Sequence, residues 1–280
     1  MIDTHCHLTF PDFAARVPEV LRTAREAGVH GCITISTTTR DCLEALAIAE
    51  RFDNVWCTSG VHPLHSHESP HDWSSIERVA RSARCVAWGE LGLDNHYDHP
   101  PRDVQDRVLA EQLAVIVGLR EREPAAFDLP VVLHCREAFA DLIPILRAAP
   151  LDPTRMVFHC FTGTPDDARL VLDFGAMISF TGVVTYRNAR DVAAAAKLVP
   201  DDRIMVETDA PFLSPEPKRG VRPCEPAMSM LTARFLADLR GVPWESPDDP
   251  GAGFHATINR NTERFFGIPA ARLATSGDRA

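Results

Sequence analysis

The chain has no long hydrophobic run, no leader-like start and no closely spaced pair of cysteines. Its 280 residues hold nothing near the roughly 18 uninterrupted apolar residues of a membrane span. The start, MIDTH, lacks the basic and apolar regions of a secretory signal peptide. Eight cysteines without a C-x-x-C spacing are typical of reduced thiols rather than of a disulfide framework. We therefore expect a cytoplasmic protein.

Positive charge is also scarce. The chain has 29 Lys and Arg against 39 Asp and Glu, which gives a net charge of −10 at pH 7. Proteins that clamp duplex nucleic acid are usually basic, so this balance excludes a general duplex clamp. It leaves open a local, metal-assisted contact with phosphate. With 45% hydrophobic residues, the composition is that of an ordinary globular domain with a sizeable core.

Short apolar, β-branched runs alternate with helical patterns along the chain. Strands are expected over residues 1–8, 31–36, 55–61, 85–91, 131–134, 156–160, 176–180 and 203–207. Helices are expected near 12–27, 40–51, 72–83, 101–121, 137–148, 165–173, 188–198, 225–240 and 254–266. Pro11-Asp12 and Thr164-Pro165 are candidate helix starts. Eight β-then-α units predict a parallel sheet, either open and doubly wound or closed into a barrel.

Polar residues at the strand ends choose between these two architectures. They are His5, His7, Glu90, His134, His159 and Asp209. In an open sheet the outermost strands would lie too far apart for these residues to share one site. A barrel places the first strand beside the eighth and brings all six residues to one mouth. We therefore predict an α/β protein with a (β/α)8 TIM barrel and a metal site at its C-terminal mouth.

The domain organisation follows from the same pattern. We expect a single barrel domain over residues 1–267 and a flexible tail over 268–280, because the tail is mostly small and polar. Residues 121–130 and 241–253 interrupt the repeat and are expected as surface insertions.

Three of the polar residues indicate a metal site by their spacing. His5 and His7 lie two residues apart in an expected strand, so both imidazoles share one face and suit a divalent ion. Glu90 is framed by Gly89 and Gly92, where a carboxylate can approach a metal closely and bridge two ions. The alternatives are a chance spacing of two among twelve histidines and a glutamate solvated at a turn.

The other three residues strengthen this interpretation. His134 and His159 each end an apolar strand, at the same depth in consecutive strands. Asp209 ends the last strand and can ligate the metal held by the first strand or take a proton from its water; a helix cap is the alternative. Four imidazoles and two carboxylates are close to what two ions need when positions stay open for water and substrate. Together they predict a binuclear site.

The chain resembles the TatD-type metal-dependent hydrolases, a branch of the amidohydrolase superfamily. The matching segments are IDTHCHL (2–8), SGVHP (59–63), GELGLD (89–94), HCREA (134–138), HCFTG (159–163), SFTGVVTYRNA (179–189), ETDAPFLSPEPKRG (207–220) and INRNTERFF (258–266). They occur in family order from end to end. After PKRG, however, the chain reads Arg222-Pro223-Cys224-Glu225-Pro226 where the family usually reads R-N-E-P. This departure concerns the loop that frames the substrate, not a metal ligand.

The resemblance implies a role for each matching residue. His5, His7 and Asp209 would hold one divalent ion, His134 and His159 the second, and Glu90 would bridge the two. Asp209 would also move the proton, as general base and then general acid, with Glu90 and Glu207 as further catalytic residues. His62, Asp94 and Arg136 are expected to contact substrate; His62 and Arg136 carry donors that match phosphate oxygens. The alternative for Arg136 is an ion pair with an acidic residue of a helix.

Members of this family are often nucleases that trim DNA, and some RNA, from the 3′ end. The resemblance implies a deoxyribonuclease-like 3′–5′ exonuclease on single-stranded DNA, with RNA as an open second substrate. Two ions about 3.5–4 Å apart can hold a bridging water and lower its pKa toward about 7, which supplies the hydroxide that cleaves the phosphodiester. The expected partners are nucleic-acid ends or oligonucleotides, and no obligate protein partner is evident. The histidine and carboxylate ligands can bind Zn, Mn or Mg.

Two other functions stay open. One is hydrolysis of another ester or amide, such as the ester of an aminoacyl-tRNA; the other is a non-catalytic, metal-stabilised binding protein. A carbamylated lysine as the metal bridge is disfavoured, because neither Lys197 nor Lys218 ends a strand in the middle of the chain and Glu90 takes that position.

Overall fold

The computed structural model describes residues 1–245, 249 and 251–268. Its eight strands are β1 (Ile2–Cys6), β2 (Gly31–Thr34), β3 (Val55–Ser59), β4 (Cys85–Asp94), β5 (Val131–Arg136), β6 (Met156–Phe158), β7 (Met177–Phe180) and β8 (Ile204–Val206). Neighbouring strands pair in parallel and in sequence order. Nearly all strand residues are buried, as expected for parallel strands covered by helices.

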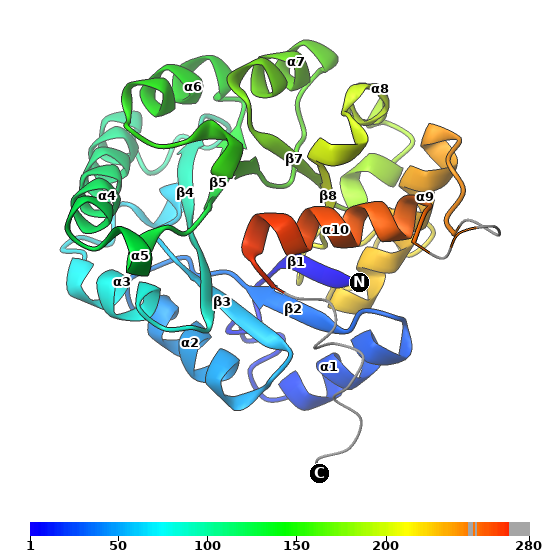
Figure 1. Ribbon diagram of the computed structural model, residues 1–280, viewed down its shortest axis with the longest axis horizontal. Helices are drawn as coiled ribbons and strands as arrows, with labels where there is room; N and C mark the ends of the chain where they lie inside the picture. The colour runs from blue at the N-terminus through cyan, green and yellow to red at the C-terminus, as the bar shows by residue number, and fades with distance from the viewer. Residues whose placement is uncertain (246–248, 250, 269–280) are drawn as a thin grey trace.

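Most of the helices surround the strands as a ring, while α10 lies across one end of the barrel (Figure 1). Within the described residues they are α1 (Val17–Glu26), α2 (Asp41–Arg51), α3 (Trp73–Ala80), α4 (Arg102–Arg122), α5 (Pro124–Phe127), α6 (Phe139–Ala148), α7 (Pro165–Phe174), α8 (Arg190–Leu198), α9 (Ser229–Arg240) and α10 (Phe254–Phe266). The alternation of strand and helix is the one that the hydrophobic pattern predicts.

The chain segment after β8 closes the barrel against β1. Cys6 and Ala210 form a parallel bridge, and the His7 N–H donates to the Ala210 carbonyl at 2.8 Å. The Asp209 N–H donates to the His5 carbonyl at 2.9 Å. The predicted (β/α)8 barrel is therefore confirmed, and its closure brings the first and last candidate metal ligands together.

A buried carboxylate lies at the same junction. Asp3 of β1 is fully buried and accepts hydrogen bonds from the Thr208 N–H at 2.9 Å and from the Thr208 hydroxyl at 2.6 Å. Burial raises the pKa of Asp3 to about 8. These bonds fix the chain immediately before Asp209 to the first strand.

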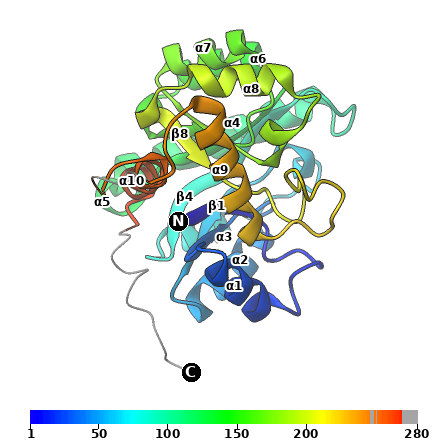
Figure 2. The ribbon, with the colours of Figure 1, turned by 90° about the vertical axis from the view of Figure 1, so that its right-hand side faces the viewer.

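Helix α10 covers the N-terminal end of the barrel. Phe265 and Phe266 join a buried apolar cluster with residues from inside the barrel, among them Val157 and Met205. The Asn261 side chain donates to the Ile204 carbonyl at 2.8 Å and so ties α10 to β8. Figure 2 shows α10 on one side of the molecule and the yellow segment between β8 and α9 projecting on the opposite side.

One of the two predicted helix starts is confirmed. Helix α7 begins at Pro165, where Thr164 and Asp167 form a reciprocal capping box. The start at Pro11-Asp12 is wrong, because α1 begins at Val17. A second proline lies in the first turn of α1, where its fixed φ suits a helix. The residues before it form turns that bury Phe13.

The predicted insertion at 121–130 is only partly a surface loop. Helix α4 continues to Arg122, and α5 follows directly. Phe127 of α5 is fully buried and stacks on Trp88, with ring centroids 6.0 Å apart, while the Trp88 indole donates to the Phe127 carbonyl. The apolar side of this segment therefore completes the core beside β4.

Part of the second predicted insertion, and most of the predicted tail, lies outside the described residues. These parts are 246–248, 250 and 269–280. Ile268, at the start of the predicted tail, is buried with the apolar cluster under α10. Among the described helices, none has the length and apolar character needed to cross a bilayer.

Candidate active site

Strand β4 is longer than predicted, and this brings two carboxylates to the mouth of the barrel. It runs to Asp94 instead of ending at Leu91, so Glu90 and Asp94 both belong to it. Gly92 permits the extension: its φ is +147°, and a Cβ there would lie 1.9 Å from the His134 carbonyl oxygen. The pairing of β4 with β5 shifts register around Glu90.

The two oxygens of Glu90 face different groups of imidazoles. Oε1 lies 2.5 Å from His159 Nε2, 2.9 Å from His134 Nδ1 and 3.5 Å from His62 Nε2. Oε2 lies 3.2 Å from His5 Nε2. Glu90 is 1% exposed, so these imidazoles replace water around its carboxylate. The Glu90 carboxylate therefore lies between two halves of the site, one on the side of Oε2 with His5 and one on the side of Oε1 with the other three imidazoles.

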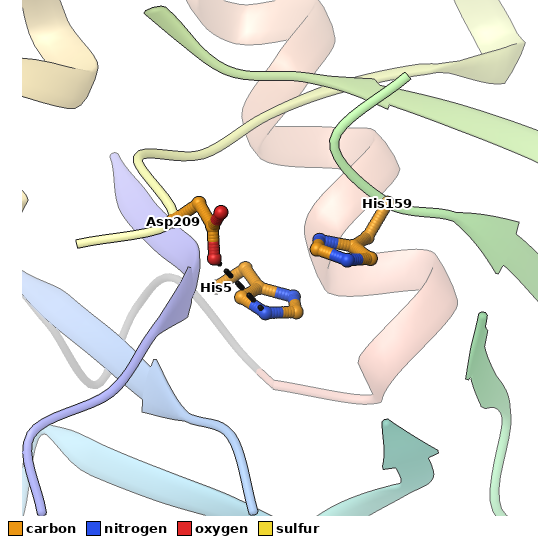
Figure 3. A group of neighbouring side chains, drawn as sticks. All are labelled: His5, His159 and Asp209. Carbon is orange, nitrogen blue, oxygen red and sulfur yellow. Dashed lines mark ion pairs between the residues drawn. The ribbon is translucent and has the colours of Figure 1, made fainter. Parts of the chain in front are cut away.

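Asp209 completes the half that contains β1. Its Oδ1 lies 3.3 Å from His7 Nε2 and 3.7 Å from His5 Nε2. Its backbone is left-handed, with φ of +62°, a conformation that is uncommon outside glycine. Figure 3 shows the ion pair between His5 and Asp209 and the His159 ring beside them, stacked on His5 at 3.8 Å between centroids.

The ligand atoms fit divalent cations. His5 Nε2 is buried and makes no hydrogen bond, although two carboxylates lie within 4 Å of it. His7 Nδ1 donates to the Ile35 carbonyl at 3.2 Å, which leaves Nε2 as the ligand atom. Three groups have ligand atoms within 4.8 Å of one another: His5–His159–Asp209, His5–His7–Glu90 and His62–Glu90–His134. Buried nitrogens and carboxylates without other partners are what a bound metal needs.

The electrostatics of the cluster keep its carboxylates ionised. Burial alone would raise the pKa of Glu90, but the surrounding histidines, His159 first, hold it well below its usual range. Burial likewise opposes ionisation of Asp209, yet the neighbouring His7 and His5 lower its pKa. Burial lowers the pKa of His5, so this imidazole is neutral and able to ligate. Burial opposes protonation of His7, His134 and His159, yet the neighbouring carboxylates raise the pKa of each, so a bound cation would displace protons from these imidazoles.

Asp94 and Glu207 lie behind two of the candidate ligands. Asp94 Oδ2 accepts a hydrogen bond from His134 Nε2 at 2.9 Å. Glu207 Oε1 accepts the Cys160 N–H at 2.6 Å and lies 3.4 Å from His159 Nδ1. Asp94 is 1% exposed and Glu207 2%; Asp94 still lines the pocket, whereas Glu207 does not. Each faces the far nitrogen of an imidazole, where a carboxylate fixes the ring orientation.

His62, which the sequence predicts as a substrate contact, lies directly beside the candidate metal ligands. Its Nε2 is 3.1 Å from His134 Nδ1, and its Nδ1 accepts the Leu64 N–H at 3.0 Å. Burial lowers its pKa well below the usual value, so it is a neutral imidazole. Arg136 ends β5 at the pocket edge, with its guanidinium 5.2 Å from the Tyr97 ring centroid. Arg136 makes no ion pair with a described residue.

The cluster lies in a pocket of about 930 Å³ at the mouth of the barrel. Besides the candidate ligands, Phe10, Tyr97, Phe212 and Arg222 line it. Tyr97 is 49% exposed and Phe212 40%, unusually high for large aromatic residues. Sequence reasoning missed Phe10, Tyr97 and Phe212, and it singled out Arg222 only as part of the loop that departs from the family pattern. Phe212 could have been found, because it follows Asp209 closely in a segment already singled out.

A pocket over buried imidazoles and carboxylates, at the C-terminal mouth of a (β/α)8 barrel, defines a metal-dependent enzyme. A sequence model of the family described as TatD related DNase matches residues 2–267. The uncharacterized metal-dependent hydrolase YcfH of Escherichia coli is 35% identical over 98% of both chains. The 3′-5′ ssDNA/RNA exonuclease TatD of Erwinia tasmaniensis is 34% identical over 96% of this chain and 100% of its own.

Among solved structures, the TatD homologue YjjV of Escherichia coli superposes with a TM-score of 0.82 at 30% identity, over 96% of this chain and 98% of the other. The chain belongs to the TatD family of metal-dependent hydrolases. The resemblance seen in the sequence motifs is therefore confirmed, and so is the prediction of a hydrolase.

Proposed function

We propose that this hydrolase is a 3′–5′ exonuclease that cleaves phosphodiester bonds of single-stranded DNA, with RNA as a second substrate. The observation that carries the proposal is the divided Glu90 carboxylate in an open pocket, with imidazoles on each oxygen. Cations held by these residues would stabilise the negative charge that develops on the phosphodiester oxygens in the transition state. The relative named for this activity is 34% identical over almost its full length.

The proposed cofactor is a pair of divalent ions. His5, His7 and Asp209 would hold one, His134 and His159 the other, and Glu90 would contribute one oxygen to each. Zinc, manganese and magnesium are all compatible with these donors. When bound, such ions activate water as a nucleophile and polarise the phosphoryl oxygen.

The chain's own residues then have separate tasks. Asp209 is ionised, 16% exposed in its side chain and open to the pocket, so its carboxylate can accept a proton and later return it. For Asp94 and Glu207 we propose that they hold His134 and His159 in position, in addition to the substrate contact and catalytic role that the sequence predicts. Arg136, without a carboxylate partner, is free to bind a phosphate at the pocket edge.

The alternatives are less well supported. Both lysines are exposed and neither lines the pocket, so a carbamylated-lysine bridge has no residue to form it. A purely structural metal site would be closed by four ligands around one ion, whereas this cluster opens into a large pocket. The remaining rival is hydrolysis of another ester, such as that of an aminoacyl-tRNA.

The location and partners stay expectations. We expect a cytoplasmic protein, because all eight cysteines are free and seven of them are buried thiols. We expect nucleic-acid ends or oligonucleotides as its binding partners, and no obligate protein partner.

The test follows single-stranded DNA labelled at the 5′ end in one sample and at the 3′ end in another. Metal-stripped protein is supplied with Mg²⁺, Mn²⁺ or Zn²⁺. We expect a ladder from the 5′ label and early release of the 3′ label. Glu90→Gln should abolish both, while Glu50→Gln, an exposed and distant carboxylate, should abolish neither. Metal-loaded protein that cleaves neither DNA nor RNA but hydrolyses an aminoacyl ester would overturn the proposal.

A further inference from the structure

Two loops at the mouth carry positive charge that the catalytic centre does not use. Residues 186–190 and 216–222 contain the cations Arg187, Arg190, Lys218, Arg219 and Arg222 and one carboxylate, Glu216. This local excess occurs in a chain with a net charge of −10. All five cations are exposed, and Arg190 begins helix α8. We call the other four, Arg187, Lys218, Arg219 and Arg222, the basic lip.

The charges of the basic lip are not neutralised. None of its four residues forms an ion pair with another described residue. Elsewhere the arginines often bind carboxylates: Arg81 contacts Glu123 at 2.7 Å, and Arg102 contacts Asp141 at 2.8 Å. Unpaired cations grouped on one edge attract an anion, and a run of them attracts a polyanion.

The two loops are held together before any ligand binds. The Arg219 guanidinium lies 4.1 Å from the Tyr186 ring centroid and donates to Asn188 Oδ1 at 3.2 Å. The Tyr186 hydroxyl donates to the Ser214 carbonyl at 3.0 Å. Gly182 permits the close approach, because a Cβ there would lie 2.1 Å from the Leu213 carbonyl oxygen. Arg219 therefore positions the lip and leaves Lys218 and Arg222 to contact a ligand.

The lip reaches the pocket at Arg222, which lines it together with the aromatic rings of Phe10 and Phe212. Phe10 stacks on His7 at 4.7 Å between ring centroids, and Phe212 packs edge-on against Phe10 at 6.0 Å. Phe212 is 40% exposed, and Arg222 lines the same pocket. Exposed aromatic rings beside cations are how proteins bind single strands without reading their sequence.

We propose that the basic lip and Phe212 form a binding site for the single strand that enters the pocket, with a base stacked on Phe212 and backbone phosphates on Lys218 and Arg222. This inference rests on the proposed nuclease function and extends it. It predicts that affinity rises with oligonucleotide length, because phosphates beyond the scissile bond reach the lip. It also explains how an acidic chain binds nucleic acid: the positive charge is confined to one edge of the mouth.

The test measures binding and cleavage separately. The lip variant is Lys218→Ala/Arg222→Ala. Its matched control is Lys197→Ala/Arg78→Ala, which removes the same two residue types from exposed positions on outer helices. Binding of a fluorescent ten-nucleotide single-stranded DNA is followed by anisotropy in EDTA, over a range of salt concentrations. Cleavage of bis(p-nitrophenyl) phosphate by metal-loaded protein reports on the metal centre alone.

We expect the lip variant to bind the oligonucleotide about ten-fold more weakly, with a salt slope smaller by roughly 1 to 1.5, since each lost phosphate contact removes about 0.7. Phe212→Ala should weaken binding by roughly ten-fold with an unchanged salt slope. The control variant should behave as wild type in both assays, and the lip variant should lose less activity on the small diester than it loses in affinity for the oligonucleotide. Equal affinity and slope in the lip variant and wild type would overturn the inference.

The two proposals fail in different ways. Wild-type protein that binds the oligonucleotide through the lip but never cleaves it with metal would refute the nuclease function and support the lip as a binding site. A lip variant that cleaves oligonucleotides with unchanged Kd and KM would support the nuclease function and refute the lip as a binding site. Wild-type protein that does not bind the oligonucleotide would refute the lip.

Discussion

The two ends of this barrel are built from opposite kinds of side chain. At the N-terminal end, Phe265 and Phe266 of α10 pack on apolar residues that project from the strands. At the C-terminal end, imidazoles and carboxylates project from the same strands into a pocket of about 930 Å³. The difference indicates that the apolar N-terminal end stabilises the fold, whereas the C-terminal end holds the buried polar groups that the chemistry requires.

The polar end is stable as folded only because its groups neutralise one another. Glu90 is surrounded by histidines, and Asp209 faces His5 and His7. A buried charge without a partner would cost several kcal/mol. Bound cations would serve the same purpose, so the mouth is expected to gain stability when it is loaded with metal.

The largest expected effect on chemistry follows from Glu90→Gln. The amide keeps the shape of the carboxylate but removes the charge shared by both halves of the site. Because metal ions supply several kcal/mol of transition-state stabilisation, kcat should fall by about 10³-fold or more. Steady-state kinetics on an oligonucleotide and on a small diester measure the loss. Glu50→Gln, on the outer surface, is the control, and a variant with a tenth of wild-type activity would refute the role given to Glu90.

The apolar end is tested by Phe265→Ala. Removing a buried phenylalanine should cost about 3–5 kcal/mol of unfolding free energy, with kcat of the folded enzyme unchanged. The matched substitution at the mouth is Phe212→Ala, which removes a 40% exposed ring and should change stability by less than about 0.5 kcal/mol. Chemical denaturation measures both. Equal losses of unfolding free energy in the two variants would contradict the proposed difference between the two ends of the barrel.

The positioning residues should show intermediate effects. Glu207→Gln and Asp94→Asn should each weaken metal affinity, and activity at limiting metal, by about 10- to 100-fold. Excess metal should restore much of the activity, because the ligand imidazoles remain. A metal titration of activity separates weakened metal binding from a role in the chemical step. A role in the chemical step would leave a loss of activity that saturating metal does not restore.

The smallest effect concerns the junction between β1 and β8. The pKa of Asp3 is raised to about 8 in the folded chain, above its unfolded value near 4. The stability it contributes is therefore full below about pH 4 and is lost as the pH rises through 8. Asp3→Asn cannot ionise, so its Tm relative to wild type should rise between pH 6.5 and 9. A constant difference in Tm over this range, in metal-stripped protein, would contradict the buried acid.

Much of this arrangement could be predicted from the sequence. The period of strands and helices predicts a parallel sheet, because parallel strands buried on both faces have recognisable apolar runs. The polar residues at the strand ends then favour the closed barrel over the open sheet. The six candidate ligands lie at strand ends, where neighbouring side chains must meet, and the structure brings all of them together.

The remaining features depend on contacts that local pattern does not contain. The extension of β4 to Asp94 depends on pairing with β5, and the burial of Phe127 depends on Trp88 across the core. Asp94 and Glu207 face the histidines His134 and His159 because of tertiary packing. The sequence motif therefore identifies both residues but does not show these contacts. The basic lip was missed because the sequence does not show that residues 186–190 and 216–222 lie side by side, which depends on contacts such as that of Arg219 with Tyr186.

The central claim is that Glu90 joins two metal sites, and metal content per chain tests it most directly. Protein loaded with Zn²⁺ or Mn²⁺, then dialysed, is measured by elemental analysis. The account predicts two ions in wild type, one each in His7→Ala and His134→Ala, and none in the double variant. A wild-type chain with a single ion, retained when either histidine is replaced, would contradict it.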